Sequence, residues 1–440
     1  MKVKVCLAII LLLAGAFLPL ISGLASASSS DNWSMFHRDL TRSGYSTAPS
    51  FVPSNNPVWN FTTNGPVSAS PAVVNYRIYI GSLRGIAYCL NAKDGSLVWN
   101  FTIHLGLQGP HGGEAAAIGS SMAVANGHVF FGAYDRNVYC LDASTGNKVW
   151  NYTTGNTVES SPAIDNGDVY VGSWDGNVYC LDALSGAKIW SFKTGSQIES
   201  SPAVVDGKVF VGSVDGSVYC LNASTGDKIW SYATGKLVQS SPAVVNGRLY
   251  IGSEDTNLYC LDASTGAKIW SYSTEGWVDS SPAVANGYVY VGCAKIDAAQ
   301  DDLPSNIYCL NAFTGDKVWN FTMKGGASYS SPAITSDLLY MGDWANNIYC
   351  LNITTGAEIW AYTTGAHVNS SPAIVGGSVF VASWDHRVYA FGTSSTVTEP
   401  FSINSEYLLI LGVIAAIVVV MIVIFIARKR ASKQKSKTSA

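Results

Sequence analysis

The sequence predicts an all-β fold, an eight-bladed β-propeller of four-stranded antiparallel blades closed by an N-terminal strand and followed by one C-terminal transmembrane helix. Three observations lead to this prediction. A tryptophan recurs about every forty residues, each repeat holds four short β-rich runs between turn residues, and an uncharged stretch of 21 residues lies at 407–427. Four strands per forty residues indicate a propeller blade, and 21 apolar residues are enough to cross a bilayer.

Residues 1–27 have the composition of a secretion signal. Lys2 and Lys4 precede an apolar run that ends near Leu24, and the small residues 25–27 suit a signal peptidase. We expect residues 1–27 to be removed on export, and the alternative is a retained membrane anchor.

The recurring tryptophans define the repeat. Their spacings are 40, 51, 40, 40, 40, 49 and 41 residues, which is a period of forty with two insertions. A large aromatic residue that recurs in a β-repeat belongs to the core, so we expect a structural belt. The belt consists of Trp59, Trp99, Trp150, Trp190, Trp230, Trp270, Trp319 and Trp360.

One repeat, residues 200–234, shows the four strands of a blade. The runs "SSPAVV", "KVFVGSV", "SVYCLNA" and "KIWSYAT" are separated by "DG", "DG" and "STGD". Short β-rich runs between such turn signals predict consecutive antiparallel strands.

The two ends of the repeat array complement each other. The last repeat stops at "RVYAFGTSS" before reaching a tryptophan, and the segment "NPVWNFTT" at 56–63 stands alone before the first repeat. Ser-Pro, or Ser-Met at Met122, marks eight inner strands. We therefore expect residues 55–392 to form eight blades, with the N-terminal strand completing the last one.

The repeated segment also resembles a known family. "CLDASTGNKVW" at 140–150 is similar, apart from cysteine in place of alanine, to the tryptophan-docking motif of pyrroloquinoline-quinone-type (PQQ-like) eight-bladed propellers. The segment "WSMFHRDLTRSGYS" at 33–46, within a lead-in of residues 28–54, resembles the start of secreted members of this family. The resemblance implies that each belt tryptophan packs against the motif of the neighbouring blade.

Seven cysteines share one position of the repeat. Equivalent positions of adjacent blades lie about 13 Å apart at this strand's distance from the axis, whereas a disulfide requires Cα atoms within about 7 Å. Disulfides around the ring are therefore excluded, and we expect small buried side chains that bind no metal. A bridge from Cys293 to a strand cysteine such as Cys309 stays open. The seven are Cys89, Cys140, Cys180, Cys220, Cys260, Cys309 and Cys350.

The C-terminal region predicts a membrane anchor. A linker of residues 393–406 precedes the apolar stretch 407–427, and the tail 428–440 carries six Lys or Arg and no acid. The positive-inside rule places this tail in the cytoplasm and the propeller outside. A single membrane, as in archaea or Gram-positive bacteria, suits this topology.

Charge argues against nucleic acid as a partner. Without Lys2, Lys4 and the six tail cations, 18 of the 26 Lys and Arg remain against 30 acids, a net charge of −12 for the exported part. Such a surface repels phosphates. Sequons for N-glycosylation occur in this part, and the sites we consider are Asn32, Asn60, Asn100, Asn151 and Asn320.

Propeller topology sorts the loops onto two faces. The turns between strands one and two and between strands three and four share one face, where the repeats are nearly identical; we name it the repeated face. The variable face holds the loops that join blades, the loops between strands two and three, and both insertions. It carries four tryptophans, Trp174, Trp277, Trp344 and Trp384. Exposed aromatic side chains indicate a recognition surface, although loop tryptophans also cover the ends of a core.

The residue two before each Ser-Pro is expected to line the mouth of the central channel. Three acids in this ring could attract a cation or an amine, and a solvated channel lining is the alternative. The ring is Ser68, Gly119, Glu159, Glu199, Gln239, Asp279, Tyr329 and Asn369. Acidic oxygens alone are a weak indication of calcium.

We expect a non-catalytic, monomeric binding or scaffold module for an envelope protein or glycan. The alternative is a PQQ-dependent dehydrogenase, or another redox or sugar-acting enzyme, that uses the channel. The PQQ enzymes that this chain resembles carry adjacent cysteines and a calcium site of Glu, Asn and Asp, and this chain has no Cys-Cys dipeptide. We therefore expect neither PQQ nor calcium, and no catalytic residue is assigned.

Overall fold

A computed structural model describes residues 32–47, 52–104, 116–295, 305–325 and 329–392. The predicted signal 1–27, linker 393–406, transmembrane stretch 407–427 and basic tail 428–440 lie outside these residues. The described ranges contain strands and turns but no helix, and accordingly none that is long and apolar enough to span a membrane.

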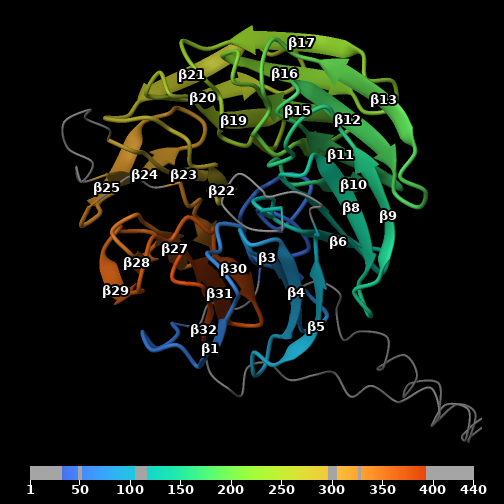
Figure 1. Cartoon of the computed structure of the whole chain (residues 1–440). Helices are drawn as coiled ribbons and strands as arrows, with labels where there is room; N and C mark the ends of the chain where they lie inside the picture. Colours follow the sequence, from blue (N-terminus) through green and yellow to red (C-terminus); the bar gives the residue numbers. More distant parts are fainter. Residues whose placement is uncertain (1–31, 48–51, 105–115, 296–304, 326–328, 393–440) are drawn as a thin grey trace, which may run out of the picture. The chain divides into compact units, whose positions relative to one another are not determined.

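Eight four-stranded antiparallel sheets surround a central axis (Figure 1). Each of the first seven blades runs outward from its first strand to its fourth in chain order. Blade 1 comprises β2 (Ala72–Val74), β3 (Arg77–Gly81), β4 (Ile86–Asn91) and β5 (Leu97–Thr102). Blade 2 comprises β6 (Ala123–Ala125), β7 (His128–Gly132), β8 (Asn137–Asp142) and β9 (Lys148–Thr153). Blade 3 comprises β10 (Ala163–Asp165), β11 (Asp168–Gly172), β12 (Asn177–Asp182) and β13 (Lys188–Lys193). Blade 4 comprises β14 (Ala203–Val205), β15 (Lys208–Gly212), β16 (Ser217–Asn222) and β17 (Lys228–Ala233).

The second half of the ring continues this pattern. Blade 5 comprises β18 (Ala243–Val245), β19 (Arg248–Gly252), β20 (Asn257–Asp262) and β21 (Lys268–Ser273). Blade 6 comprises β22 (Ala283–Ala285), β23 (Tyr288–Gly292), β24 (Asn306–Asn311) and β25 (Lys317–Thr322). Blade 7 comprises β26 (Ala333–Ile334), β27 (Leu338–Gly342), β28 (Asn347–Asn352) and β29 (Glu358–Thr363). Blade 8 comprises β30 (Ala373–Val375), β31 (Ser378–Ser383), β32 (Arg387–Phe391) and, as its outer strand, β1 (Trp59–Thr62).

The ring is closed by its own N-terminal strand, as predicted. β1 pairs antiparallel with β32, with Trp59 opposite Ala390. A second closure runs around the axis, where the second serine of each inner-strand motif accepts a hydrogen bond from the equivalent backbone N–H of the preceding blade. The last link joins Ser371 N–H to Ser70 Oγ at 2.9 Å. The acceptors are Ser121, Ser161, Ser201, Ser241, Ser281, Ser331, Ser371 and Ser70.

The belt tryptophans fasten adjacent blades. Trp190 of β13 donates its indole N–H to the carbonyl of Ala223 in the next blade at 2.8 Å. A Cβ atom on Gly226, whose φ is +77°, would lie 2.7 Å from the same indole. Equivalent indole bonds join the other blades through Trp59, Trp99, Trp150, Trp230, Trp270 and Trp319. Trp360 has no such partner among the described residues, and stacks on Phe391 with ring centroids 5.4 Å apart.

The repeated cysteines are buried and carry free thiols. Cys180 lies in register between Tyr170 and Trp190. Burial raises the pKa of this thiol to about 12, so the thiolate is strongly disfavoured. Cys293 and Cys309 are also free, so the bridge left open by the sequence is not formed.

Candidate functional site

The lead-in segment lies across the inner strands near the axis, drawn in dark blue (Figure 1). Trp33 exchanges two backbone hydrogen bonds of 2.8 Å with Val73 of blade 1, and Ser34 O accepts from Val124 of blade 2 at 2.7 Å. Further along, Leu40 O accepts from Val204 of blade 4 at 2.9 Å. Thr41, Ser43 and Gly44 do the same for Val244, Val284 and Ile334 of blades 5 to 7. The segment therefore satisfies inner-edge N–H groups of six blades.

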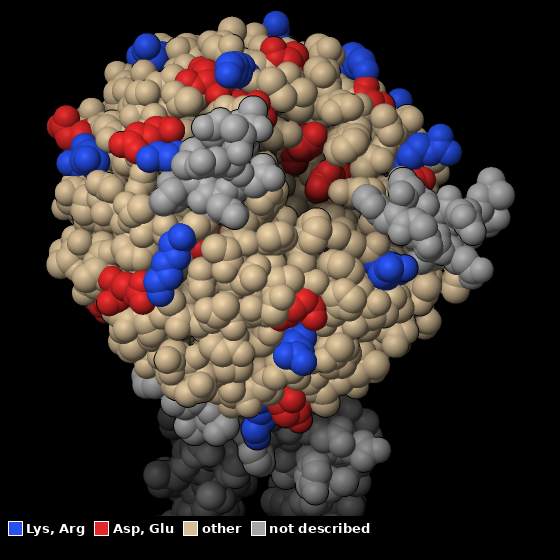
Figure 2. All heavy atoms as spheres, turned by 60° about the vertical axis from the view of Figure 1, so that its left-hand side comes forward, with Lys and Arg blue, Asp and Glu red and all other residues tan. Residues whose placement is uncertain are grey.

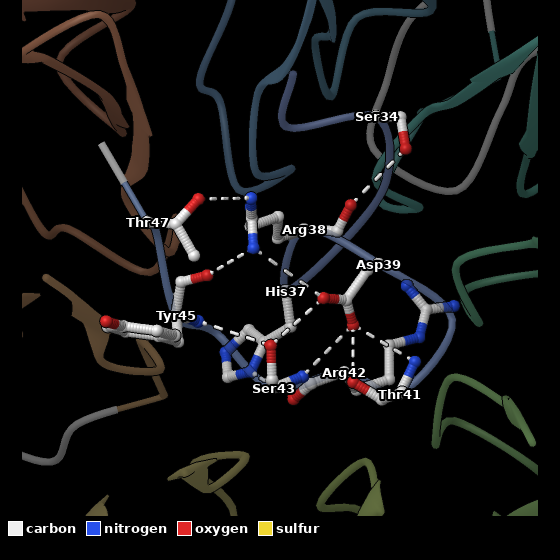
Figure 3. A network of polar contacts seen from close by, with 9 residues as sticks. All are labelled: Ser34, His37, Arg38, Asp39, Thr41, Arg42, Ser43, Tyr45 and Thr47. Atoms are coloured by element: carbon white, nitrogen blue, oxygen red, sulfur yellow. Dashed lines mark hydrogen bonds and ion pairs between the residues drawn. The ribbon is translucent and has the colours of Figure 1, made fainter. Parts of the chain in front are cut away.

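A buried arginine holds the centre of this segment (Figure 3). The Arg42 guanidinium donates to the carbonyls of Phe36, Ser161, Pro162 and Pro202, the last at 2.9 Å. Burial lowers the pKa of Arg42 to about 9. These bonds tie blades 3 and 4 to the segment, so it is an integral part of the propeller.

The channel-mouth residues lie on the variable face, two positions before the second serine of each motif and four positions before the first residue of each inner strand. Glu159 precedes β10, and Glu199 precedes β14. Gln239 donates its amide to Glu199 Oε2 at 2.7 Å, across the boundary between blades 4 and 5. Asp279 precedes β22. A hollow containing acidic side chains and no Lys or Arg opens near the centre of the propeller face turned forward in Figure 2.

Four acids form what we call the acidic sector: Glu159, Glu199, Glu254 and Asp279. Burial, followed by the charges of Glu159 and Asp279, raises the pKa of Glu199 to about 7. Burial also raises the pKa of Glu159, although the hydroxyl of Tyr134 acts in the opposite direction. The carboxylates lie close enough to disfavour one another's ionisation.

Asp279 is the most confined member of the acidic sector. It is 9% exposed, and neither carboxylate oxygen has a hydrogen-bond partner among the described residues. Burial, followed by the charge of Glu254, raises its pKa to about 7. The amide oxygen of Asn369 is likewise buried and without a partner in the described chain. Buried acceptors of this kind are costly unless a donor meets them.

Next to Asp279 around the ring, blades 7 and 8 carry the aromatic sector: Tyr329, Trp344, His367 and Trp384. The Trp344 ring lies 4.9 Å from that of Tyr329 and 5.4 Å from that of His367. His367 in turn meets Trp384 at 6.0 Å. The four rings therefore run from the channel mouth to Trp384, which is 37% exposed.

The two sectors meet at the channel mouth. Burial, followed by the charges of Asp279, Glu254 and Glu199, raises the pKa of Tyr329 to about 12. An acidic wall and an aromatic wall thus border one channel mouth.

The structure places the other predicted site tryptophans apart from this row. Trp174 packs on Tyr134 at 6.4 Å in blades 2 and 3, and Trp277 pairs its backbone with Ala294. Only Trp384 of the four is exposed, so the expectation of exposed aromatics is wrong for Trp174, Trp277 and Trp344, which are half-buried.

Sequence reasoning missed Glu254 and His367. Glu254 occupies the loop between strands two and three at the position that Trp174 has in blade 3, and its N–H bonds Leu237 O as that of Trp174 bonds Thr157 O. Aligning the repeats on this loop would have found it. His367 differs, because its link to Trp344 depends on a contact between two loops.

Two other features bear on the location of the site. The candidate glycosylation residues Asn60, Asn100, Asn151 and Asn320 are exposed on outer strands, and Asn32 is half-buried.

A cavity of about 500 Å³ lies beside the lead-in segment on the repeated face, lined by residues such as Asp206, Phe210 and Asn246. Apart from three lead-in residues, its lining comes from strands and turns of the repeats, where the blades differ less in sequence than on the variable face.

Comparison with known protein families agrees with the propeller fold. The family described as the β-propeller of the beta-alanine-activating enzyme matches residues 169–408, or 240 of 440 residues. The chain belongs to this propeller family. The family described as outer membrane protein assembly factor BamB matches residues 51–164. The resemblance to PQQ-like repeats is thereby confirmed.

Individual relatives are similar over parts of the chain. Quinohemoprotein alcohol dehydrogenase of Comamonas testosteroni is 32% identical over 137 residues, 30% of this chain and 19% of the relative. Its solved structure has a TM-score of 0.69 at 14% identity and covers 86% of this chain and 83% of that one. BamB of Salmonella typhimurium is 32% identical over 81 residues, 18% of this chain and 20% of the relative. The matched part thus spans about a fifth of these curated relatives.

The structure of BamB from Moraxella catarrhalis has a TM-score of 0.65 at 19% identity, covering 77% of this chain and 99% of that chain. At these identities the solved structures establish the shared fold alone.

The dehydrogenase names imply a quinone cofactor. Within the described ranges, no three His, Cys, Asp or Glu side chains are grouped so that they could hold a metal ion. Glu199 is instead engaged by the Gln239 amide. The acids occupy one arc of the mouth, in blades 3 to 6, and are not grouped into the compact oxygen ligand set that calcium prefers. The residues present therefore do not fit a quinone with calcium, and the expectation that neither binds stays a prediction.

Proposed function

We propose that this protein is a non-catalytic binding propeller of the cell surface, and that its variable face captures a protein of the cell envelope. The observation that carries the proposal is the aromatic sector. It combines two exposed rings, those of Trp384 and His367, with the half-buried rings of Trp344 and Tyr329 behind them, and aromatic side chains are enriched in interface hot spots.

Two further observations support the proposal. The chain is similar to BamB, whose name describes an assembly factor. The predicted signal and the predicted anchor at 407–427 would place the propeller outside the cell with its C-terminus in the cytoplasm. A glycan of the envelope remains the other candidate partner.

Site-specific photo-crosslinking in intact cells tests this proposal. A photoreactive phenylalanine derivative replaces Trp384 on the variable face or, as a control, Phe313, an aromatic residue that is 55% exposed in a turn of the repeated face. We expect a discrete, protease-sensitive adduct from position 384 and none from position 313. An adduct from 313 alone would contradict the assignment of the face, and a protease-resistant adduct would identify a glycan.

Affinity provides the second measurement. Trp384→Ala should weaken capture of the crosslinked partner at least tenfold, which corresponds to about 1.4 kcal/mol. It should leave the melting temperature nearly unchanged, because the ring is exposed. Phe313→Ala should change neither quantity. Unchanged capture by the Trp384 variant would move the binding site elsewhere.

A second candidate function, favoured by the similarity to quinohemoprotein dehydrogenases and by the buried acids, is a redox or sugar-acting enzyme that uses the channel. The test is to add pyrroloquinoline quinone and Ca²⁺ to the full-length protein and assay alcohol and sugar oxidation. Turnover that Asp279→Asn abolishes would replace the binding proposal.

A further inference from the structure

The acidic sector has few cations near it. In the described blades, neither the mouth positions nor the positions that correspond to Glu254 in the other loops between strands two and three hold Lys or Arg, although Arg84, Arg136 and Lys295 occur elsewhere in these loops. Lys236 acts on Glu254 at the edge of the sector. Asp279 is nine-tenths buried, and both of its oxygens lack a partner within the described chain. A buried anionic acceptor without a donor calls for a cationic ligand.

The remaining groups at the mouth restrict the kind of cation. Asp279 and the Asn369 amide oxygen need N–H or O–H donors, which a quaternary ammonium does not have. Among the described residues, the acids are not grouped into a metal site. The Tyr329 and Trp344 rings of the adjacent blade favour an organic cation, because aromatic faces attract ammonium groups.

From this juxtaposition we propose that the channel mouth binds a primary alkylammonium group at Asp279 and Glu199, beside the rings of Tyr329 and Trp344. The inference deepens the proposed function, since it rests on the variable face being the binding face. It also names the chemical group that the partner inserts.

The same ammonium could belong to a free amine or to a lysine side chain of a partner protein. Trp344 has an indole N–H without a partner in the described chain, so an acceptor on the same ligand would add a contact. A lysine residue, with its backbone carbonyl, supplies one. The two sources are distinguished by comparing n-butylammonium with Nα-acetyl-lysine methylamide.

Isothermal titration calorimetry on the full-length protein in detergent tests the inference at constant ionic strength. We expect n-butylammonium to bind, and tetramethylammonium, which has the same charge without N–H donors, to bind at least tenfold more weakly. Tighter binding of the lysine derivative than of n-butylammonium would indicate a partner's lysine. Binding of n-butylammonium alone would indicate a free amine. Equal binding of both ammonium ions, or binding of Ca²⁺ in preference to them, would overturn the inference.

Matched variants locate the site. Asp279→Asn should weaken n-butylammonium binding at least tenfold, and Glu199→Gln at least threefold. Asp206→Asn makes the same chemical change in a repeated-face turn where other blades carry Asn166, Asn246 and Asn286, and should have no effect. If Asp279→Asn did not fold, the Glu199 variant would decide the result. Unaltered binding by Asp279→Asn or by Glu199→Gln would contradict the placement.

This experiment separates the two proposals. Loss of ammonium binding in Asp279→Asn is measured without any partner protein. If the unaltered protein bound neither n-butylammonium nor the lysine derivative while partner capture still depended on Trp384, the proposed function would stand and only this inference would be overturned.

Discussion

Gly226 serves both a turn and a blade interface. Its φ of +77° lies in the left-handed region, and a Cβ atom there would lie 2.7 Å from the Trp190 indole. Gly207 has a similar φ of +68°, yet a Cβ atom on it would meet nothing within 4 Å. The two glycines therefore separate the cost of backbone conformation from the cost of crowding.

We predict that Gly226→Ala destabilises the protein by about 2–4 kcal/mol, the sum of a positive-φ penalty and overpacking against the indole. Gly207→Ala should cost only about 1 kcal/mol, because only the conformational penalty remains. Urea denaturation followed by tryptophan fluorescence measures both. Equal losses in the two variants would show that the indole tolerates the added methyl group.

Asp279 links the candidate site to stability. Its folded pKa of about 7 lies above the unfolded value near 3.9, so the folded state binds more protons between these values. This group therefore makes the protein less stable as the pH rises from about 4 to 7.

We predict that Asp279→Asn raises the free energy of unfolding at pH 8 by about 2–4 kcal/mol, because it removes a buried charge. At pH 5 the gain should be much smaller, since the native carboxyl is then largely protonated. Denaturation at the two pH values measures the difference. A gain that does not depend on pH would show that the carboxylate is solvated.

At the scale of the element, the lead-in segment acts as a ninth component of the ring. Its bonds to six blades and the buried guanidinium of Arg42 connect inner strands that are distant in sequence. Losing these bonds would leave several buried carbonyls and N–H groups without partners.

Arg42→Met should therefore lower the free energy of unfolding by about 2–4 kcal/mol, because the carbonyls of Ser161, Pro162 and Pro202 lose their donor. Arg84→Met, at an exposed loop position, should change it by less than about 0.5 kcal/mol. Thermal and chemical denaturation of both variants check this. An unchanged free energy of unfolding in the Arg42 variant would show that the bonds of the guanidinium do not contribute to stability.

Blade 7 shows why some element-level details escape sequence reasoning. In blade 3, Asp175 accepts from the Tyr179 hydroxyl at 2.6 Å, and blade 7 has Ala345 at the equivalent position. There Asp343, two residues earlier, accepts from the Tyr349 hydroxyl at 2.8 Å. The pattern of repeats predicts that the tyrosine hydroxyl of blade 7 has no carboxylate partner. In the folded protein, Asp343 reaches that hydroxyl from a different position of the loop.

For the whole molecule, the number of free thiols tests two predictions: removal of the signal peptide, which contains Cys6, and the absence of disulfides among the other cysteines. The sequence has nine cysteines, of which Cys6 lies in the predicted signal and the other eight are free and buried. We predict eight reactive thiols in the denatured, unreduced mature protein, and almost none in the native protein, because burial hinders their ionisation. Nine thiols would indicate that residues 1–27 are retained, and six would indicate one disulfide.

The sequence by itself determined the blade number, the closure by β1 and the inter-blade role of the belt, because each is written as a repeat. Contacts that recur in every blade require the same residue types at a regular spacing, and this spacing is visible in the sequence. Only the tertiary structure decided the path of the lead-in segment, the burial of Asp279 and the meeting of the acidic and aromatic sectors. These features depend on contacts between individual loops of different blades. Each such contact occurs only once, so it produces no repeated pattern in the sequence.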